Sequence, residues 1–342
     1  MAGRVRHPID LKALERYVDE HVPQIKTPLD IKQFGFGQSN PTYQLTDATN
    51  GRFVLRKKPP GKLLSKAAHK AYCLCEDDSV VGTPFYIMEF LDGRIFEDAA
   101  MPEASSPEER KALWKAATLT LARLHRVAPG DVGLEGFGKR SGFYDRQIQT
   151  WTTICESQAA AVDRETGEKV GDLPHFGEMV RFFGDKGRQP RDRGTLIHGD
   201  YKIDNIVFHK TEARVIGILE PPLSDLCNFL HPYFSASRAG SGIYAHDGFL
   251  PGATPGLPTT EEIVGWYASE AGWQPAPELN WGMAFSMFRL AAVCQGIAAR
   301  AAQGQASSEQ AKRFAVTRGP LAEFAWELVG RSLGQDGEKA KL

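Results

Sequence analysis

The segment that most constrains this 342-residue chain is "GTLIHGDYKIDNIVFH", residues 194–209. Its ends are short apolar runs, Leu196-Ile197 and 206–208, which predict two buried strands. A simple hairpin connection needs only roughly two to five residues, whereas this one is longer and carries charges of both signs. Loops held on rigid elements often carry catalytic groups, so we interpret 198–205 as a functional loop. A solvated turn is the alternative, because Asp and Asn are common turn residues.

Hydrophobic periodicity divides the chain into two parts. Apolar residues three and four apart in 8–22 predict an amphipathic helix, and 31–57 predicts three strands joined by a glycine turn and a hairpin. A further strand is predicted in 83–91, and helices are predicted from 107 to 127, over much of 142–186, and from 259 to 331. We therefore predict an N-terminal helix (1–26), a β-rich part (27–92), a larger helical part (93–332) and a flexible polar tail (333–342).

Composition excludes several classes of protein. The formal net charge of -1 gives no general surface for polyanions, so we expect no nucleic-acid partner. No apolar run was seen to approach the roughly 18 residues of a membrane span, and the start lacks the apolar region of a secretory signal, so we expect no membrane partner. The five scattered cysteines predict reduced core thiols in a reducing compartment.

Two short motifs precede the functional loop. In "FGFGQSN", Gly35 and Gly37 fall on a turn between strands, where small residues let backbone amides close over phosphates. The motif lacks a third glycine and a following helix, which argues against a dinucleotide fold, and a plain hairpin turn remains open. In "FVLRKK", Arg56 and Lys57 end an apolar strand, so one of them can point into a cleft, although such a strand end is often only solvated.

The spacing of polar residues in the functional loop suits phosphoryl transfer. Asp200 and Asn205 are spaced so that a carboxylate can orient a hydroxyl while an amide oxygen holds a metal ion. Lys202 lies two residues after Asp200, where it can neutralise a transferring phosphate.

The loop "HGDYKIDN" resembles the H-G-D-x-x-x-x-N catalytic loop of the aminoglycoside phosphotransferase family. The resemblance extends from about residue 30 to 330 and includes "QFGFGQSNPTYQL", "RFVLRKKPPGKLL", "FYIMEFLDG", "PLSDL" and "FRLAAVCQGIAARA". It implies an α+β, protein-kinase-like fold with two lobes: a small antiparallel β-rich N-lobe that binds nucleotide and a larger, mostly helical C-lobe.

Roles carry over residue by residue from this resemblance. Asp200 would be the catalytic base, Lys202 would offset charge on the transferring group, and Asn205 would bind Mg²⁺. The proposed ATP-binding residues are Gly35, Gly37 and Ser39 of the nucleotide loop, Arg56 at the α- and β-phosphates, and Glu89 and Leu91 at the adenine edge. Asp225 resembles an aspartate that braces the loop backbone, although an ordinary carboxylate at a helix start is an alternative. His198 is expected to support the loop.

The chain departs from the family at two places. Relatives have a further helix of about 20 residues before "AYCLCEDD", whose Glu aligns the basic residue of the third strand. After "VIGIL" the chain also runs directly into Pro221-Pro222, where relatives have a metal-binding Asp and several more residues, and only Glu220 stands near that place. A Glu there could still bind Mg²⁺, with the metal shifted by its longer arm.

The resemblance implies an ATP-dependent, Mg²⁺-dependent phosphotransferase that acts on a hydroxyl of a small molecule. The alternative is a catalytically impaired pseudokinase or nucleotide-binding protein, because of the two missing segments. A Ser-His-Asp hydrolase is excluded by the lack of a G-x-S-x-G motif. Some relatives are linked to acyl-CoA dehydrogenases, so a hydroxyacyl-CoA is the expected acceptor. Aminoglycosides are disfavoured, since the sequence shows no concentrated acidic cluster.

The last three residues, Ala340-Lys341-Leu342, resemble the small-basic-Leu tripeptide that a peroxisomal import receptor recognises. Peroxisomal localisation is therefore expected, with the cytoplasm as the alternative, because a tripeptide pattern also arises by chance.

Overall fold

The structure is a computed structural model that describes residues 2–3, 5, 9–34, 41–57, 70–136, 138–219, 222–236, 246–305 and 309–339. The chain forms two compact units. The first comprises Met1–Ile95 with Asn205–Glu220, and the second comprises Phe96–Asp204 with Pro221–Leu342. We predicted a boundary at 92/93; in the structure the first segment of the first unit ends at Ile95, and Asn205–Glu220 also belongs to that unit.

The first unit contains a six-stranded antiparallel sheet. Its strands are β1 (Ala2–Gly3), β2 (Asp30–Phe34), β3 (Thr42–Thr46), β4 (Arg52–Lys57), β5 (Ala71–Cys75) and β6 (Phe85–Glu89), in the order β1-β2-β3-β4-β6-β5. Leu55 lies between Tyr43 of β3 and Ile87 of β6 in the register, and all three side chains are fully buried. The predicted strands at 52–57 and 83–91 are confirmed, while β5 was not predicted.

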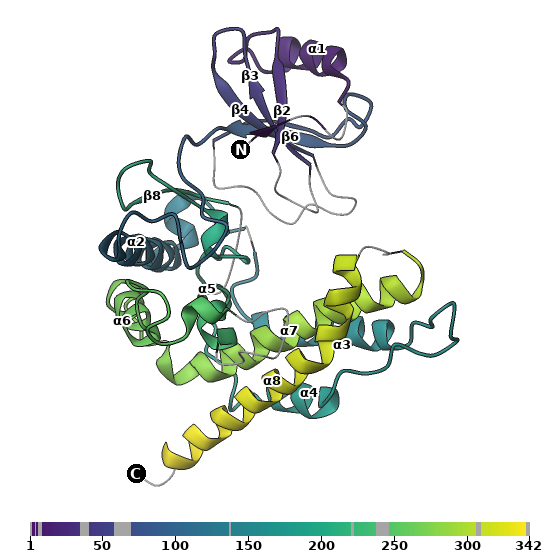
Figure 1. The fold of residues 1–342 in the computed structure, drawn as a ribbon, viewed down its shortest axis with the longest axis vertical. Coiled ribbons are helices and arrows are strands. Elements are labelled where there is room, and N and C mark those ends of the chain that lie inside the picture. The colour runs from purple at the N-terminus through teal and green to yellow at the C-terminus, as the bar shows by residue number, and fades with distance from the viewer. Residues whose placement is uncertain are drawn as a thin grey trace. The chain divides into compact units, whose positions relative to one another are not determined.

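Helix α1 (Leu11–His21) covers one face of this sheet (Figure 1). Asp10 caps it by accepting a hydrogen bond from the Ala13 amide at 3.0 Å, which satisfies an otherwise unpaired N–H of the first turn. Leu14 and Val18 are fully buried against the sheet residues of the same core. Each such side chain stabilises the unit by about 2 kcal/mol through removal of apolar surface from water. The predicted amphipathic helix is confirmed.

The β7 (Ile206–Phe208) and β8 (Val215–Ile218) strands form an antiparallel hairpin in the first unit. Arg94 attaches it through two backbone hydrogen bonds with Phe208, and Asp92 contacts Lys210 at 2.5 Å. The apolar run Leu196-Ile197 is not a strand, contrary to our prediction. The run is too short to complete a buried ladder: β7 pairs with β8 instead, and Ile197 is 42% exposed.

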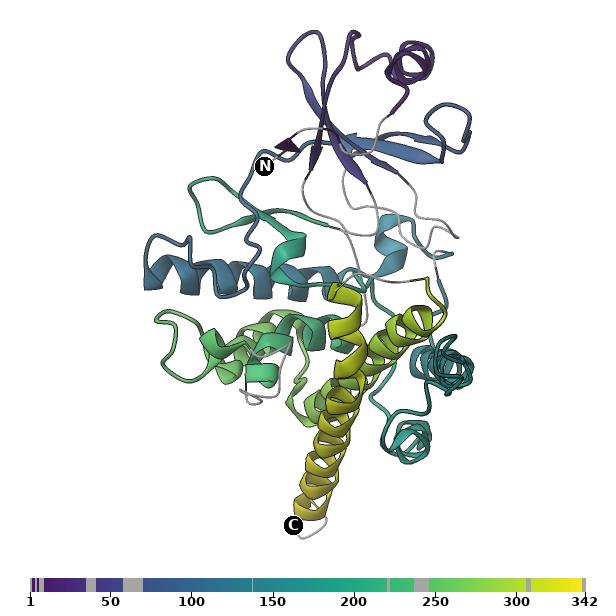
Figure 2. The same cartoon turned by 45° about the vertical axis from the view of Figure 1, so that its right-hand side comes forward.

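The second unit is helical. Its α-helices are α2 (Pro107–Arg126), α3 (Phe143–Ala159), α4 (Phe176–Gly184), α5 (Pro222–Ala236), α6 (Thr260–Ala271), α7 (Ala276–Ala302) and α8 (Glu309–Lys339). Short 3-10 helices are η1 (Pro129–Val132), η2 (Ile203–Asn205) and η3 (Asp247–Phe249). The last residue of η2, Asn205, is counted with the first unit. α2 packs against α6, and α7 packs against α3, α5 and α8. In Figure 2, α8 (yellow) packs across α7 (yellow-green). The helices predicted in 107–127, 142–186 and 259–331 are confirmed.

Two long helices differ from expectation. By length and composition alone, α7 could cross a membrane, which our reading of the sequence overlooked; 67% of its apolar window is buried by the rest of the structure, as in the core helix of a soluble protein. α8 continues through Lys339, whereas we expected a flexible tail from 333. Two glycines in the last turns lower helix propensity by only about 1 kcal/mol each, which is not enough to end a helix of this length. The tripeptide 340–342 lies outside the described residues.

Candidate active site

The backbone of the functional loop is held by one buried carboxylate. Asp225, in the first turn of α5, accepts hydrogen bonds from the amides of His198 and Gly199, both at 2.7 Å. Its side chain is fully buried and also contacts Nε2 of His125 at 3.2 Å. Because buried polar groups are costly when unpaired, these contacts fix the loop where it enters its turn. Asp225 is therefore a brace, as the resemblance implied, and more than a charge at a helix start.

Apolar anchors hold the rest of the loop. Tyr201 is fully buried, and its hydroxyl donates to the carbonyl of Ala117 on α2 at 2.7 Å. Ile203, two residues later, is 2% exposed. The side chains of Asp200 and Lys202, which alternate with these anchors along the chain, remain accessible to solvent. The alternation of buried and exposed residues therefore presents the polar side chains on one side of the loop.

Lys202 lies between two carboxylates. Its Nζ is 3.7 Å from Oδ2 of Asp200 and 3.2 Å from Oδ2 of Asp204. Partial burial opposes its charge, but the two carboxylates outweigh that effect, so the pKa of Lys202 is raised above its usual value. The structure thus brings Asp200 and Lys202 together, with a permanent cation beside the predicted base.

These residues line a cavity of about 1020 Å³ within the second unit. Besides Asp200 and Asp204, the lining carboxylates are Glu97, Asp98 and Asp247, which come from segments far apart in the sequence. The cavity therefore has the acidic lining that the sequence did not show. Our inference that no acidic cluster exists was wrong, because it considered only residues that are neighbours along the chain.

The same cavity has an apolar wall and a partly buried cation. Trp151, Leu290 and Val293 contribute apolar surface, and Val293 is 45% exposed. Arg289 also lines the cavity, and its Nη1 donates to Oγ of Ser224 at 2.8 Å. Desolvation lowers the pKa of Arg289, partly offset by nearby carboxylates including Asp225 and Asp200, but an arginine stays charged. The cavity can thus receive an acceptor with both an apolar and a polar part.

In the first unit, strand geometry distinguishes the two basic residues at the end of β4. Alternate side chains face opposite sides of a sheet, and Phe53 and Leu55 pack in the core with α1. Lys57 shares that side, its Nζ donates to the carbonyl of Val81 at 2.8 Å, and burial lowers its pKa. Arg56 is therefore on the face of the sheet opposite α1.

The predicted adenine-edge residues follow β6 directly. The amide of Glu89 donates to the carbonyl of Lys70 at 3.0 Å, and the carbonyl of Leu91 accepts from the amide of Gly93 at 3.0 Å. Adenine would therefore have to use the other backbone group of each residue: the Glu89 carbonyl and the Leu91 amide. The predicted nucleotide-loop residues Gly35, Gly37 and Ser39 lie outside the described residues, as does 58–69, next to the predicted helix deletion.

The donors predicted for Mg²⁺ are only partly described. Asn205 ends the one-turn helix η2, its carbonyl accepts from the amide of Leu219 at 2.6 Å, and Glu220 lies outside the described residues. Across the described ranges, no group of three His, Cys, Asp or Glu side chains is positioned as a metal cluster. The donors at hand, the Asn205 amide and the loop carboxylates, are all oxygen, which is the donor type that Mg²⁺ prefers. They fit the ion by donor chemistry.

Sequence reasoning missed several residues of this site. His125 lies on the buried face of α2, four residues after Leu121, and its Nδ1 is 2.6 Å from the hydroxyl of Tyr267. A histidine at a core position of an amphipathic helix was the only available signal. Arg289 lies within "FRLAAVC" of α7, where a charge in a mostly apolar helix was a comparable signal. Neither signal indicated which residue would be the partner.

The sheet unit, the helical unit and the braced Asp-Lys loop define a protein-kinase-like phosphotransferase fold. Comparison with known families agrees: the family model described as "Phosphotransferase enzyme family" matches residues 30–219. The chain therefore belongs to this aminoglycoside phosphotransferase (APH) family, and the predicted family and fold class are confirmed.

Individual relatives extend the match over nearly the whole chain. Acyl-CoA dehydrogenase family member 11 of Homo sapiens is 35% identical over 96% of this chain, as is its Gallus gallus counterpart, but the match covers 44% of each relative. The chain thus spans less than half the length of these relatives. A Ralstonia eutropha protein named as a "putative aminoglycoside phosphotransferase" is 32% identical with a TM-score of 0.76, covering 95% of this chain and 99% of that one. A choline kinase of Cryptosporidium parvum shares the fold at 10% identity and a TM-score of 0.57, covering 97% of each chain.

Proposed function

We propose that this chain transfers the γ-phosphate of ATP to a hydroxyl of a small molecule. The observation that carries the proposal is the arrangement of the loop. Asp225 fixes its backbone, Lys202 lies between Asp200 and Asp204, and these charged side chains line a cavity large enough for a small-molecule acceptor. Membership of a phosphotransferase family supports the same reaction class.

Each loop residue has a defined task in this proposal. Asp200 accepts a hydrogen bond from the acceptor hydroxyl, orients its oxygen for in-line attack and takes its proton. Lys202 offsets negative charge on the transferring phosphoryl group. Phosphoryl transfer requires little covalent chemistry from the protein, so positioning and charge neutralisation are the main contributions.

ATP and Mg²⁺ are the proposed cofactors. Arg56 would contact the phosphates, and the Glu89 carbonyl with the Leu91 amide would meet adenine. Asn205 and Glu220 would hold the metal ion, which neutralises phosphate charge when bound. Because Glu220 stands where relatives carry an Asp, we expect a Mg²⁺ requirement at higher concentration than in relatives with the complete segment.

Replacing the carboxylate of Asp200 by an amide tests its assignment as the catalytic base. Asp200→Asn keeps the shape of the side chain but removes the base, so it should abolish phosphate transfer and leave ATP binding within about twofold. Asp172→Asn, an exposed aspartate outside the cavity, is the matched control and should keep full turnover. Transfer by Asp200→Asn at the wild-type rate would refute Asp200 as the base.

A catalytically impaired pseudokinase is the alternative proposal, based on the two segments that the sequence lacks relative to its family. It predicts that the wild-type chain binds ATP with no transfer to any hydroxyl acceptor and no ATP hydrolysis above that of Asp200→Asn. Single-turnover assays with γ-labelled ATP separate the two proposals.

A hydroxyacyl-CoA is the acceptor that we propose. The support is the match to acyl-CoA dehydrogenase family members and the apolar wall of Trp151, Leu290 and Val293 beside partly buried Arg289. An acyl chain can lie on this wall, and the guanidinium can hold a carbonyl oxygen by a charge-assisted hydrogen bond.

A second class of acceptor is favoured by the carboxylates Glu97, Asp98 and Asp247, which would attract a cationic amino alcohol. The two classes differ in how they respond to Arg289→Gln. This change should raise the KM of a hydroxyacyl thioester several-fold. It should leave the KM of an amino alcohol unchanged or lower it, because a like charge is removed. Turnover of amino alcohols alone would contradict the acyl proposal.

A further inference from the structure

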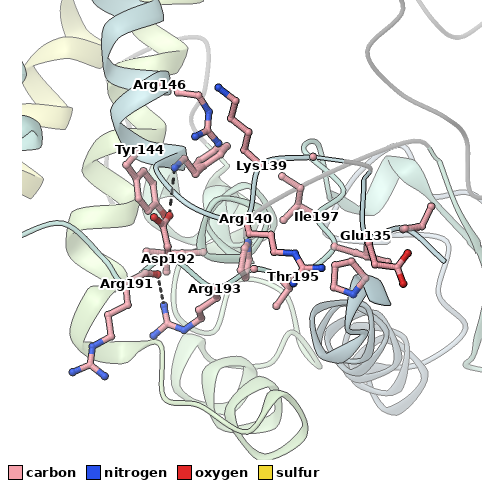
Figure 3. A pocket seen from close by; sticks show the side chains of 18 residues that line it. Glu135, Lys139, Arg140, Tyr144, Arg146, Arg191, Asp192, Arg193, Thr195 and Ile197 are labelled. Carbon is pink, nitrogen blue, oxygen red and sulfur yellow. Dashed lines mark hydrogen bonds between the residues drawn. The ribbon is translucent and has the colours of Figure 1, made fainter. Parts of the chain in front are cut away.

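A second cavity in the helical unit is rich in cationic side chains. We call it the basic cavity (Figure 3). It has a volume of about 260 Å³, and its lining includes Lys139, Arg140, Arg146, Arg191 and Arg193. The lining carboxylates are Glu135 and Asp192. None of these residues belongs to the acidic cavity that contains Asp200, so the basic cavity is a separate feature of the same unit.

Some of these charges already have partners. Arg193 forms two hydrogen bonds with the carboxylate of Glu278, at 2.8 and 3.0 Å, and stacks 3.6 Å above the ring of Trp273. Asp192 accepts hydrogen bonds from the amides of Gly142 and Phe143, so it caps the start of α3; the bond from Phe143 is dashed in Figure 3. Its negative charge is directed to backbone N–H groups and is not paired with a cation of the cavity.

Other cations have no such partner. Lys139, Arg140 and Arg191 are exposed and form no ion pair with any residue in the part of the chain that the structure describes. Of the two lining carboxylates, Asp192 accepts backbone amides, whereas Glu135 accepts none among the described residues. Three unpaired cations against one such carboxylate leave the concave surface positive, and a concave positive surface concentrates anions.

The floor between the cations is apolar. Leu196, Ile197 and Phe143 line it, and Ile197 is 42% exposed, so apolar surface is open to a ligand there. An apolar floor surrounded by arginine and lysine suits a ligand with a flat or aliphatic part that ends in phosphate. Arginine recognises phosphate oxygens through its planar fork of donors, and lysine acts as a point charge.

The basic cavity is continuous along the chain with the catalytic loop. Ile197 of its floor is three residues before Asp200, a separation of at most about 11 Å along an extended backbone. The floor of the basic cavity and Asp200 are therefore near neighbours in the helical unit.

We propose that the basic cavity binds a phosphate-bearing group. The phosphate has two potential sources: the phosphorylated tail of the acceptor itself, or a separate phosphorylated small molecule. The binding site does not depend on the proposed function; only the first source rests on it.

Direct binding tests the site without any turnover. Isothermal titration calorimetry of the full chain, with ADP and Mg²⁺ present to occupy the ATP site, measures binding of inorganic pyrophosphate and of adenosine 3′,5′-bisphosphate. The wild type should bind at least one of them, and the double change Lys139→Gln with Arg140→Gln should weaken that binding at least about tenfold, because two charge-assisted contacts are lost. Circular dichroism and thermal melting verify that the variant is folded.

A matched control removes the same charge elsewhere. Arg164→Gln with Lys169→Gln neutralises two exposed cations of the same unit that lie outside both cavities, and it should bind both probes like the wild type. The proposed site would be overturned if the wild type bound neither probe in the presence of ADP. It would also be overturned if the two double variants weakened probe binding equally.

Two acceptors with the same acyl group identify the source. A hydroxyacyl-coenzyme A carries phosphates, and the corresponding N-acetylcysteamine thioester carries none. If the acceptor supplies the phosphate, the Lys139/Arg140 variant raises the KM of the coenzyme A thioester at least about fivefold and leaves the other KM unchanged. If the phosphate belongs to a separate molecule, neither KM changes while pyrophosphate binding is still lost, which supports the site and assigns the second source. If neither thioester is phosphorylated by the wild type, the proposed acceptor fails, and the calorimetric result alone still decides the site.

Discussion

His125 and Asp225 form a buried pair in the helical unit. Nε2 of the imidazole lies 3.2 Å from Oδ2 of the carboxylate, and the two side chains are 1% and 0% exposed. The same carboxylate accepts the amide hydrogens of His198 and Gly199, so the pair connects the core of the unit to the catalytic loop. The hydroxyl of Tyr267 contacts the other ring nitrogen of His125 and extends the network.

Asp225→Ala should strongly destabilise the protein. The change leaves two backbone amides and His125 without their acceptor in the interior, so we expect a loss of about 3–5 kcal/mol in the free energy of unfolding. Urea denaturation followed by circular dichroism measures it. Glu168→Ala, at an exposed position of the same unit, should change the value by less than about 0.5 kcal/mol. A loss as small as that of the control would show that the brace is not required.

Lys202→Met should lower kcat by about 10- to 100-fold, equivalent to about 1.4–2.7 kcal/mol of transition-state stabilisation. The substitution keeps much of the stem but removes the charge beside Asp200, so acceptor KM should change little. Steady-state kinetics measure both parameters. Lys169→Met, on an exposed loop outside the cavity, should leave both unchanged. A large rise in acceptor KM with unchanged kcat would assign Lys202 to binding and contradict the proposed role.

Gly93→Ala should weaken the attachment of the β7–β8 hairpin. A Cβ at this position would lie 2.3 Å from the carbonyl oxygen of Phe208 and 2.6 Å from Cγ1 of Val207, so backbone must move. We expect about 1–3 kcal/mol of destabilisation and faster amide hydrogen exchange in 206–218. Gly136→Ala, with nothing within 4 Å of the added Cβ, is the control and should have little effect. Equal exchange rates in both variants would contradict the prediction.

His231 should make stability fall in mild acid. Desolvation by burial, with a smaller contribution from His246, lowers the pKa of His231 from 6.5 to about 4. Between these two pH values the unfolded chain binds a proton that the folded chain does not, so the free energy of unfolding decreases as pH falls from 6.5 to 4. The full effect is about 3 kcal/mol.

The contribution of His231 is isolated by difference. His231→Gln removes the titrating group, so the pH dependence of its unfolding free energy should be shallower than that of the wild type between pH 6.5 and 4. Above about pH 8 the difference between the two proteins should no longer depend on pH, because both states of the wild type are then neutral at this position. Parallel pH profiles over the whole range would refute the assignment.

The sequence by itself determined the features that depend on near neighbours in the chain. α1 follows from apolar residues three and four apart, and the β4 strand follows from a short apolar run between turn residues. Asp200 and Lys202 could be assigned together because only one residue separates them, and the buried Tyr201 and Ile203 hold their side chains on one side of the loop. Periodicity and short spacings are local, so one sequence is enough to read them.

Only the tertiary structure decided which distant residues meet. His125 and Asp225 are 100 residues apart, and nothing along the chain indicated that an imidazole on α2 would face the carboxylate that braces the loop. The carboxylates Glu97, Asp98 and Asp247 form an acidic lining with Asp200 only because segments far apart in the sequence pack around one cavity. Packing of side chains in three dimensions sets these contacts, and it leaves no periodic or spacing signal in a single sequence.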